Sequence, residues 1–186
     1  METKLTTLIL PEGTFTVATD HFDHNDRENL KHVYNHWREL CVQLNDLNAR
    51  SINLPEGLSE TAFCVFTNSV RVVKSIHGAN SSMDAYDLSS QKRIQIKSCS
   101  VLPDLSSFGP NTQYDELFFQ DFYRSGKWDY KVDVYKIPLR LINSTMVNSR
   151  QTFKQVQALG KRPRFSIWEK IIVPQKLEPI MSYSLE

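Results

Sequence analysis

Apolar residues recur every three or four positions between residues 28 and 48, and this spacing predicts an amphipathic helix. The segment reads ENLKHVYNHWRELCVQLNDLN, and its apolar members fall on one side of a helix. They are Leu30, Val33, Tyr34, Trp37, Leu40, Cys41, Leu44 and Leu47. Because such a stripe is stabilised by leaving water, we expect this side of the helix to face the core.

Pro55 and Gly57 then interrupt the helical pattern. We expect a second helix from about Ser59 to residue 75, with Glu60 in its first turn. An acidic residue at that position is favourable simply because it lies at the positive end of the helix dipole.

Strand-like runs follow at residues 83–88, 92–99, 116–123 and 130–137, and a short helix is expected at about 151–159. Helices, a sheet and closing helices predict an α/β domain built on a mixed β-sheet flanked by helices. We expect residues 1–186 to form a single domain. It comprises a helical part at about 25–75, a sheet at about 82–138 and a C-terminal part at about 139–186.

The segment at residues 83–99 predicts a hairpin that brings polar side chains together. If Ser89 and Ser90 form its tip, Asp84 lies opposite Gln95. Gln95 and Lys97 share one face at ~3.3 Å per residue, so Asp84, Gln95 and Lys97 form one patch. Asp87 points away, although a slip of one residue would exchange the two aspartates.

These three side chains have the chemistry of a metal-dependent hydrolase. Asp84 is a hard oxygen ligand suited to Mg²⁺, and the side-chain oxygen of Gln95 can also coordinate it. Lys97 can orient a water molecule or stabilise charge on a phosphate. A surface hairpin with a weak exposed Asp–Lys pair explains the same spacing, because a pattern of so few residues has many chance matches.

The charge distribution points to a local anionic partner. The net charge is +1, yet residues 136–181 carry nine Lys or Arg against two Asp or Glu. Such a basic segment on a nearly neutral chain suits either an anionic ligand or a solvated surface. The three cysteines fit neither a disulfide framework nor a zinc site, and no apolar run could span a bilayer. We expect an intracellular protein with buried free thiols.

Several blocks of the sequence carry a more specific resemblance. They are INLPEGLSETAFC, SSMDAYD, KRIQIKS, DLSSFGP, YDELFFQDFY and KRPRFSI. In this order, over about residues 25–173, they resemble a family of small bacterial type II restriction endonucleases within the PD-(D/E)xK nuclease superfamily. The resemblance implies the restriction-endonuclease-like fold, a cytoplasmic location in a prokaryote, and cleavage at a GC-rich interrupted palindrome of the GC-N-GC kind.

The resemblance assigns catalytic roles to individual residues. Asp84 stands at the position of the motif aspartate and Lys97 at that of the motif lysine. Gln95 occupies the central position, which is usually acidic, so the metal site carries one negative charge fewer and a two-metal mechanism loses support. Many members of the superfamily supply a further carboxylate from a preceding helix. Glu60 is the candidate, with Glu56 as the alternative, and the implied metal ligands are Asp84, Gln95 and Glu60.

The basic block GKRPRF is the candidate for DNA recognition. Arginine can bind guanine through O6 and N7, which makes Arg162 and Arg164 candidate base contacts. Lys154 and Lys161 are more suited to phosphates.

Two further positions are each open to two interpretations. Ser107, in the LSSFGP segment, either approaches the DNA backbone or belongs to an ordinary connecting loop. Arg124 is either a DNA contact or a charge at a hairpin tip.

The sequence thus predicts a Mg²⁺-dependent homodimeric type II restriction endonuclease that acts on double-stranded DNA. A two-fold dimer suits a palindromic site, although a monomer that dimerises only on DNA would serve equally. Two alternatives remain at this point. One is a repair or junction-resolving nuclease on the same fold. The other is a DNA-binding module that has lost catalysis, which the glutamine at position 95 makes conceivable.

Overall fold

A long mixed β-sheet organises the chain in the computed structural model, which describes residues 1–73, 76–79 and 83–186. Among these residues, the strands of the sheet lie in the order β1 (Glu2–Leu10), β2 (Gly13–His21), β3 (Val70–Val72), β4 (Ala85–Asp87), β5 (Lys92–Cys99), β7 (Glu116–Asp121), β8 (Lys131–Ile137) and β10 (Met181–Ser184). Strands β5 and β7 run parallel, and the other neighbouring pairs are antiparallel. The predicted mixed sheet is therefore confirmed.

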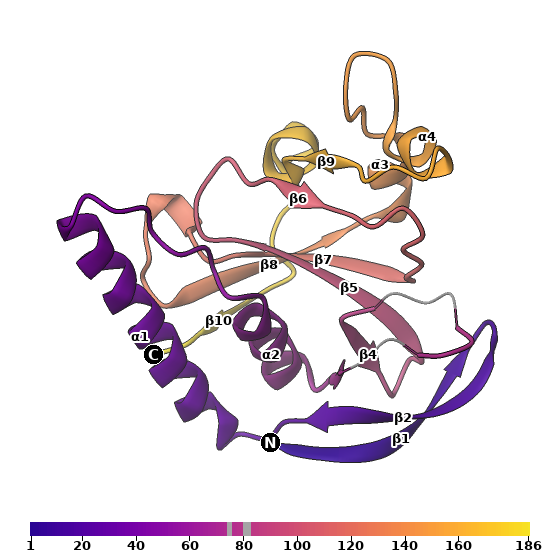
Figure 1. Ribbon diagram of the computed structural model, residues 1–186, viewed down its shortest axis with the longest axis horizontal. Helices are drawn as coiled ribbons and strands as arrows, with labels where there is room; N and C mark the ends of the chain where they lie inside the picture. The colour runs from indigo at the N-terminus through magenta and orange to yellow at the C-terminus, as the bar shows by residue number, and fades with distance from the viewer. Residues whose placement is uncertain (74–75, 80–82) are drawn as a thin grey trace.

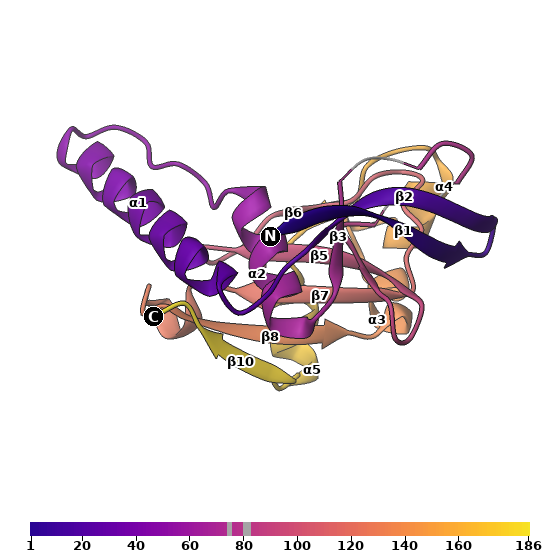
Figure 2. The same cartoon turned by 90° about the horizontal axis from the view of Figure 1, so that it is seen from below.

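Helices and a small ribbon cover the central strands on both faces (Figures 1 and 2). The helices are α1 (Asp26–Asp46), α2 (Glu56–Thr67), α3 (Leu139–Ser144), α4 (Phe153–Ala158), α5 (Val173–Gln175), the 3₁₀-helix η1 (Arg124–Gly126) and the π-helix η2 (Trp168–Ile172). The ribbon pairs β6 (Ser106–Ser107) with β9 (Arg164–Phe165). None of the helices in the described part of the chain has the length and apolar character needed to cross a membrane.

Two hydrophobic cores lie on opposite faces of β7 and β8, as the alternation of these strands requires. Phe118 and Val134 pack beneath α1 and α2, while Phe119 and Tyr135 point to the other face. There they join apolar residues from β9, α3, α4 and η2. A third, smaller cluster packs the β1–β2 hairpin against β3 and β4.

Helix α1 confirms the first predicted helix, but its apolar stripe is only partly buried. Tyr34 and Trp37 are buried, whereas Val33, Leu40 and Leu47 keep exposed fractions of 48%, 42% and 76%. The expectation that the whole stripe faces the core was therefore wrong. The three exposed residues recur every seven positions and therefore lie along one margin of the stripe, beside the buried line that faces the core.

The second predicted helix is shorter than expected. Helix α2 begins at Glu56 and is followed by Asn68, whose positive φ of 62° ends it. A left-handed residue of this kind commonly stops a helix. The β-branched Val70–Val72 segment then forms strand β3, so the predicted helical continuation was wrong there, and residues 74 and 75 lie outside the described residues.

The later elements largely confirm the sequence pattern. Strands β4, β5, β7 and β8 and helix α4 fall within the predicted ranges 83–88, 92–99, 116–123, 130–137 and 151–159. The three cysteines, Cys41, Cys64 and Cys99, are free and buried as expected. The pattern analysis missed β1, β2, α3 and β10, as well as the β6–β9 ribbon.

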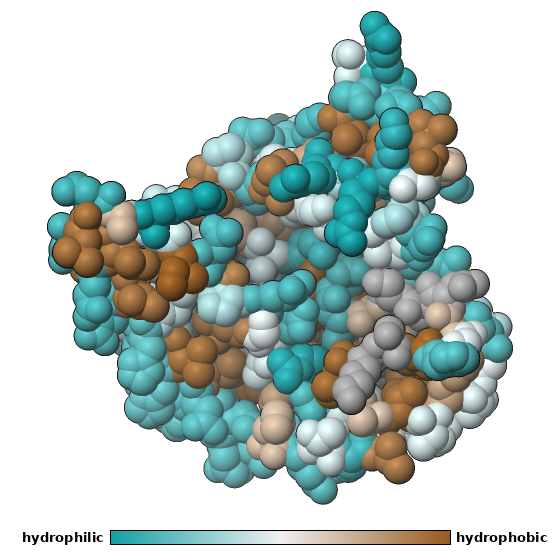
Figure 3. All heavy atoms as spheres, in the orientation of Figure 1, coloured by the Kyte–Doolittle hydropathy of each residue, from teal (hydrophilic) through white to brown (hydrophobic). Residues whose placement is uncertain are grey.

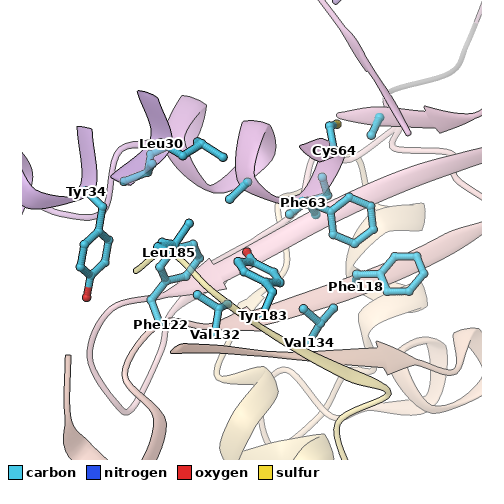
Figure 4. Packing of buried hydrophobic residues seen from close by; sticks show 14 of the residues in the cluster. Leu30, Tyr34, Phe63, Cys64, Phe118, Phe122, Val132, Val134, Tyr183 and Leu185 are labelled. Atoms are coloured by element: carbon cyan, nitrogen blue, oxygen red, sulfur yellow. The ribbon is translucent and has the colours of Figure 1, made fainter. Parts of the chain in front are cut away.

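A hydrogen-bonded chain links the last strand to helix α2. The buried Tyr183 hydroxyl donates to Gln120 Oε1, and Gln120 Nε2 donates to the carbonyl oxygen of Ser59 at 2.9 Å. Tyr183 also stacks on Phe66 with ring centres 4.2 Å apart. Figure 4 shows Tyr183 between the helices and the sheet. This chain fixes α2 over the sheet next to Glu60.

A second buried network holds the ribbon. Asp104 accepts hydrogen bonds from the hydroxyls of Ser106 and Ser166 at 2.8 and 2.6 Å. It also accepts from the backbone N–H groups of Ile167 and Trp168, each at 3.1 Å. One carboxylate thereby joins the connection before β6 to the segment after β9.

We expect Tyr183→Phe to lower the free energy of unfolding by about 1–2 kcal/mol, because it leaves the buried Gln120 oxygen without its donor. Urea denaturation of the variant and the wild type measures the difference. An unchanged free energy of unfolding would show that the Tyr183–Gln120 hydrogen bond does not hold α2 in place.

Candidate active site

Asp84 is held in position by its own backbone, immediately before β4. Its N–H donates to the Ile94 carbonyl at 2.9 Å, and its carbonyl accepts from the Val72 N–H at 3.1 Å. The β4–β5 pairing places Ala85 opposite Ile94, so Asp84 falls opposite Gln95 as the hairpin geometry predicted. The predicted register is therefore correct.

The Asp84 side chain takes over the role of a strand partner for β5. Its Oδ2 atom accepts from the Ile96 N–H at 2.7 Å and also from Gln95 Nε2. A carboxylate that accepts from a backbone N–H and an amide is locked in one orientation. Asp87, in contrast, accepts from Ser89 and Ser90 at the hairpin tip, away from this site.

The Gln95 amide has one satisfied end and one unsatisfied end. Its nitrogen donates to Asp84, whereas its Oε1 atom is buried without a hydrogen-bond partner. Leaving a buried acceptor unpaired costs about 1–3 kcal/mol. The arrangement therefore offers a cation a neutral oxygen ligand next to a carboxylate.

A pocket of about 260 Å³ lies beside this pair, between α2, the edge of β5 and the ribbon. We call it the catalytic pocket. It is lined by Leu54, Glu56, Ser59, Glu60, Ile96, Lys97, Ser98, Leu105, Ser106 and Ser107. Four residues singled out from the sequence meet in this pocket, although they come from three different elements: Glu56, Glu60, Lys97 and Ser107.

Negative charge accumulates around this pocket. Burial, together with the charges of Asp84 and Glu56, raises the pKa of Glu60 to about 7, against the weaker opposing effects of Arg71 and Lys97. Burial also raises the pKa of Asp84, while the charge of Lys97 and the hydrogen bond from the Ile96 N–H oppose it. The local cations thus compensate the two carboxylates only in part.

Lys97 lies at the boundary between the pocket and the ribbon. Its Nζ is 5.5 Å from the ring centre of Phe108. A cation–π contact of this kind is worth about 0.5–1 kcal/mol and restrains the position of the ammonium group. The charge of Lys97 also lowers the pKa of both Asp84 and Glu60, so its ammonium group acts on both carboxylates of the candidate site.

The donor set fits a hard divalent cation that retains some of its water. In the described part of the chain, no group of three or more His, Cys, Asp or Glu side chains could hold a metal by itself. Mg²⁺ commonly needs only one or two carboxylates besides water and substrate phosphate. Asp84, the unpaired oxygen of Gln95 and the neighbouring Glu60 meet that requirement.

The candidate DNA contacts divide between the pocket and the outer surface. Ser107 lies directly opposite Arg164 in the ribbon. Lys154, Lys161 and Arg162 are exposed and do not line the catalytic pocket.

Arg124 is placed differently from these residues. It follows β7 in η1 and forms an ion pair with Asp133 at 3.2 Å. A DNA contact by Arg124 would have to compete with that pair.

A second pocket, of about 500 Å³, shares Leu54, Ser98 and Leu105 with the catalytic pocket. It contains two polar residues that sequence reasoning missed, Arg50 and Asn53, from the connection between α1 and α2. The run of Asn, Arg and Ser at residues 48–53 was the available signal. Figure 3 shows the surface hollowed between the part formed by β6, β9, α3 and α4 and the part below it, with hydrophilic side chains reaching over the hollow.

Two comparisons with known proteins give a match to the same family. A family model described as Bsp6I restriction endonuclease matches residues 22–174. The type II restriction enzyme Bsp6I from Bacillus sp. (strain RFL6) is 30% identical over 161 residues, covering 85% of this chain and 87% of that enzyme. No solved structure gives a significant match. The family match contains Asp84, Gln95 and Lys97, and the chain belongs to the Bsp6I family of type II restriction endonucleases.

Proposed function

We propose that this enzyme cleaves both strands of double-stranded DNA in a Mg²⁺-dependent reaction at a short GC-rich interrupted palindrome. Each cut leaves a 5′-phosphate and a 3′-hydroxyl. The observation that carries the proposal is the paired arrangement of Asp84 and Gln95, with a buried unpaired oxygen, beside a pocket containing Glu60 and Lys97. The similarity to a type II restriction enzyme supports it.

Asp84, Gln95 Oε1 and Glu60 are the residues that would hold the metal. When bound, Mg²⁺ polarises the scissile phosphate and lowers the pKa of a water molecule. Asp84 supplies the oriented charged ligand, because two hydrogen bonds fix its carboxylate. Gln95 contributes no charge, and this lower total charge favours a single metal ion over two.

Lys97 acts on the nucleophile and on the phosphate. Its ammonium, restrained beside Phe108, can orient the attacking water and stabilise negative charge that develops on the phosphoryl oxygens. Because this charge grows in the transition state, the interaction accelerates the reaction more than it strengthens DNA binding.

A homodimer accounts for cleavage of both strands. A two-fold axis in the protein matches the symmetry of a palindromic site and gives each strand its own catalytic pocket. Within each subunit, Arg162 and Arg164 are the two candidates for the guanine contact, and Lys154 and Lys161 are the proposed phosphate contacts. Ser107 belongs to strand β6 of the ribbon and lines the catalytic pocket, where its hydroxyl is suited to the DNA backbone.

Incubation of the purified protein with plasmid DNA and Mg²⁺ tests the proposed function. Discrete fragments with a common sequence at their ends would support it. Cleavage of branched DNA regardless of sequence would identify a repair or junction-resolving nuclease instead. Binding without cleavage would identify a DNA-binding module.

Asp84→Asn is expected to lower the cleavage rate by about a thousandfold or more, because the metal loses its main charged ligand. Asp87→Ala is the matched control: its carboxylate caps the hairpin tip, so we expect a loss of stability with cleavage retained. Rates on plasmid DNA and thermal unfolding separate the two effects. An inactive Asp87→Ala beside an active Asp84→Asn would contradict the assignment.

Lys97→Ala is expected to bind cognate DNA in Ca²⁺ with nearly wild-type affinity and to fail to cut it in Mg²⁺. An interaction realised mainly in the transition state contributes to rate rather than to binding. Gel-shift titration and single-turnover cleavage measure the two quantities. A large loss of affinity with a normal single-turnover rate would make Lys97 a binding residue.

Glu60→Gln is expected to stabilise the metal-free protein at pH 8 while abolishing cleavage. The folded-state pKa of about 7 lies above the ordinary 4.5, so the folded protein loses stability as the pH rises through this interval. Glutamine removes that loss, which is on the order of 1 kcal/mol once solvent screening is included. The difference should disappear towards pH 4.5.

Urea denaturation in EDTA at pH 5 and pH 8, with cleavage assays, checks this expectation. Glu56→Gln, one turn earlier in the same helix and exposed, is the comparison. It should retain cleavage and should stabilise the protein at pH 8 less than Glu60→Gln does, because it removes only the part of the Glu60 pKa shift that comes from the charge of Glu56. If Glu56→Gln is inactive and Glu60→Gln active, Glu56 is the helix carboxylate.

A further inference from the structure

The second pocket is a cationic recess next to the catalytic pocket. Its walls come from the connection between α1 and α2 on one side and from the β5–β6 connection and β9 on the other. Figure 1 shows the chain after α1 crossing below the β5–β6 connection. The shared lining residues Leu54, Ser98 and Leu105 make the two pockets neighbours in one hollow.

Two guanidinium groups face this recess from opposite walls. Arg50 comes from the connection after α1, and Arg164 comes from β9. Both are exposed, and neither takes part in an ion pair among the described residues. Asn53 and Ser98 add an amide and a hydroxyl to the lining. Such a set of donors suits an oxyanion, because one guanidinium group can donate two parallel hydrogen bonds to two oxygens of a phosphate.

Asp104, the acidic residue that lines the recess, brings one negative charge against the two positive charges of Arg50 and Arg164. Both of its carboxylate oxygens accept hydrogen bonds from the ribbon side, from Ser106, Ser166, Ile167 and Trp168. Asp104 is buried, with an exposed fraction of 7%. Its carboxylate therefore anchors the segment that carries Arg164.

The position of the recess favours the DNA backbone over a free anion. A strand that places its scissile phosphate in the catalytic pocket brings its next phosphates close by, since successive phosphates of one strand rise only about 3.4 Å along the helix axis. We propose that Arg50 and Arg164 together bind a backbone phosphate adjacent to the scissile one. The inference rests on the proposed function and adds a subsite to it.

This assignment also divides the roles of the two arginines in the ribbon. Arg162 and Arg164 are both exposed, on either side of the buried Pro163. Arg164 lines the recess and Arg162 does not. Arg164 is thus a phosphate ligand, and the guanine contact falls to Arg162.

Binding to DNA duplexes that carry a single neutral methylphosphonate tests the phosphate subsite. Each phosphate of the duplex is replaced in turn, and affinity is measured in Ca²⁺ for the wild type, Arg50→Ala and Arg140→Ala. Arg140 is an exposed arginine of α3 outside both pockets and serves as the control. Cleavage of unmodified DNA in Mg²⁺ locates the scissile phosphate.

We expect the wild type to lose about tenfold or more in affinity when a phosphate next to the scissile one is neutralised. Arg50→Ala should show a similar loss on unmodified DNA and little further loss at that phosphate, whereas Arg140→Ala should behave like the wild type. Equal sensitivity of Arg50→Ala and the wild type at every phosphate would overturn the proposal.

The activity assay keeps the two proposals apart. Coupling here means that Arg50→Ala reduces the effect of neutralising one particular phosphate. Normal cleavage without such coupling rejects the phosphate subsite in the recess and leaves the proposed activity in place. Coupling without cleavage rejects the proposed activity and retains the recess as a phosphate site, while the absence of DNA binding rejects both.

Salt titrations on cognate and scrambled duplexes test the division between the arginines. Arg164→Ala should weaken both duplexes equally and reduce the slope of log K against log salt by about one. Arg162→Ala should instead reduce the ratio between the affinities for the cognate and the scrambled duplex. If Arg164→Ala loses the preference for cognate over scrambled DNA while the salt slope is unchanged, Arg164 contacts a base and not a phosphate.

Discussion

The hydrogen bond from the Ile96 N–H to Asp84 is the contact on which the site depends. Strand β4 begins at Ala85, directly after Asp84, and the Asp84 carboxylate takes the place of a backbone acceptor for the Ile96 N–H. The hydrogen bond gives the Ile96 N–H an acceptor and fixes the orientation of the carboxylate. The same oxygen also accepts from the Gln95 amide. This arrangement also leaves the edge of β5 around Lys97 open towards α2 and the ribbon, where the catalytic pocket forms.

The electrostatics of the pocket are consistent with the proposed binding of a cation. Burial raises the pKa of both Glu60 and Asp84. The charge of Asp84 raises that of Glu60 further, and Lys97 lowers both pKa values only in part. The carboxylates are held there by packing, because the Tyr183–Gln120–Ser59 chain fixes α2 independently of charge. The buried carboxylates proposed for catalysis thus lower the stability of the fold, and the packing and hydrogen bonds of the core beneath them offset this loss. Such a division is common at functional sites.

The parts of the fold that were predictable are those set by contacts close in sequence. Asp84 and Gln95 could be paired because hairpin register follows from alternation and a short turn. The end of α2 was missed because a helical pattern continued in Val70 and Val73, while Asn68 imposed the stop. Strand β10 pairs with β8 from more than forty residues away, a contact that local periodicity does not contain. The β1–β2 hairpin, in contrast, carried a readable signal in its Pro11–Gly13 turn between two β-rich runs.

Arg124 and Arg50 show what limits the prediction of a binding surface from sequence. Arg124 looked suitable because of its neighbours in sequence, yet Asp133 across the β7–β8 pair engages it. Arg50 attracted no attention, yet the fold carries it to the recess that Arg164 lines from β9. Whether a cation can bind DNA depends on which acids the tertiary structure places beside it. Here Asp104 accepts hydrogen bonds from four neutral donors and pairs with no arginine in the described part of the chain, whereas Asp133 forms an ion pair with Arg124. Arg50 and Arg164 therefore keep their charges available beside the proposed metal ligands.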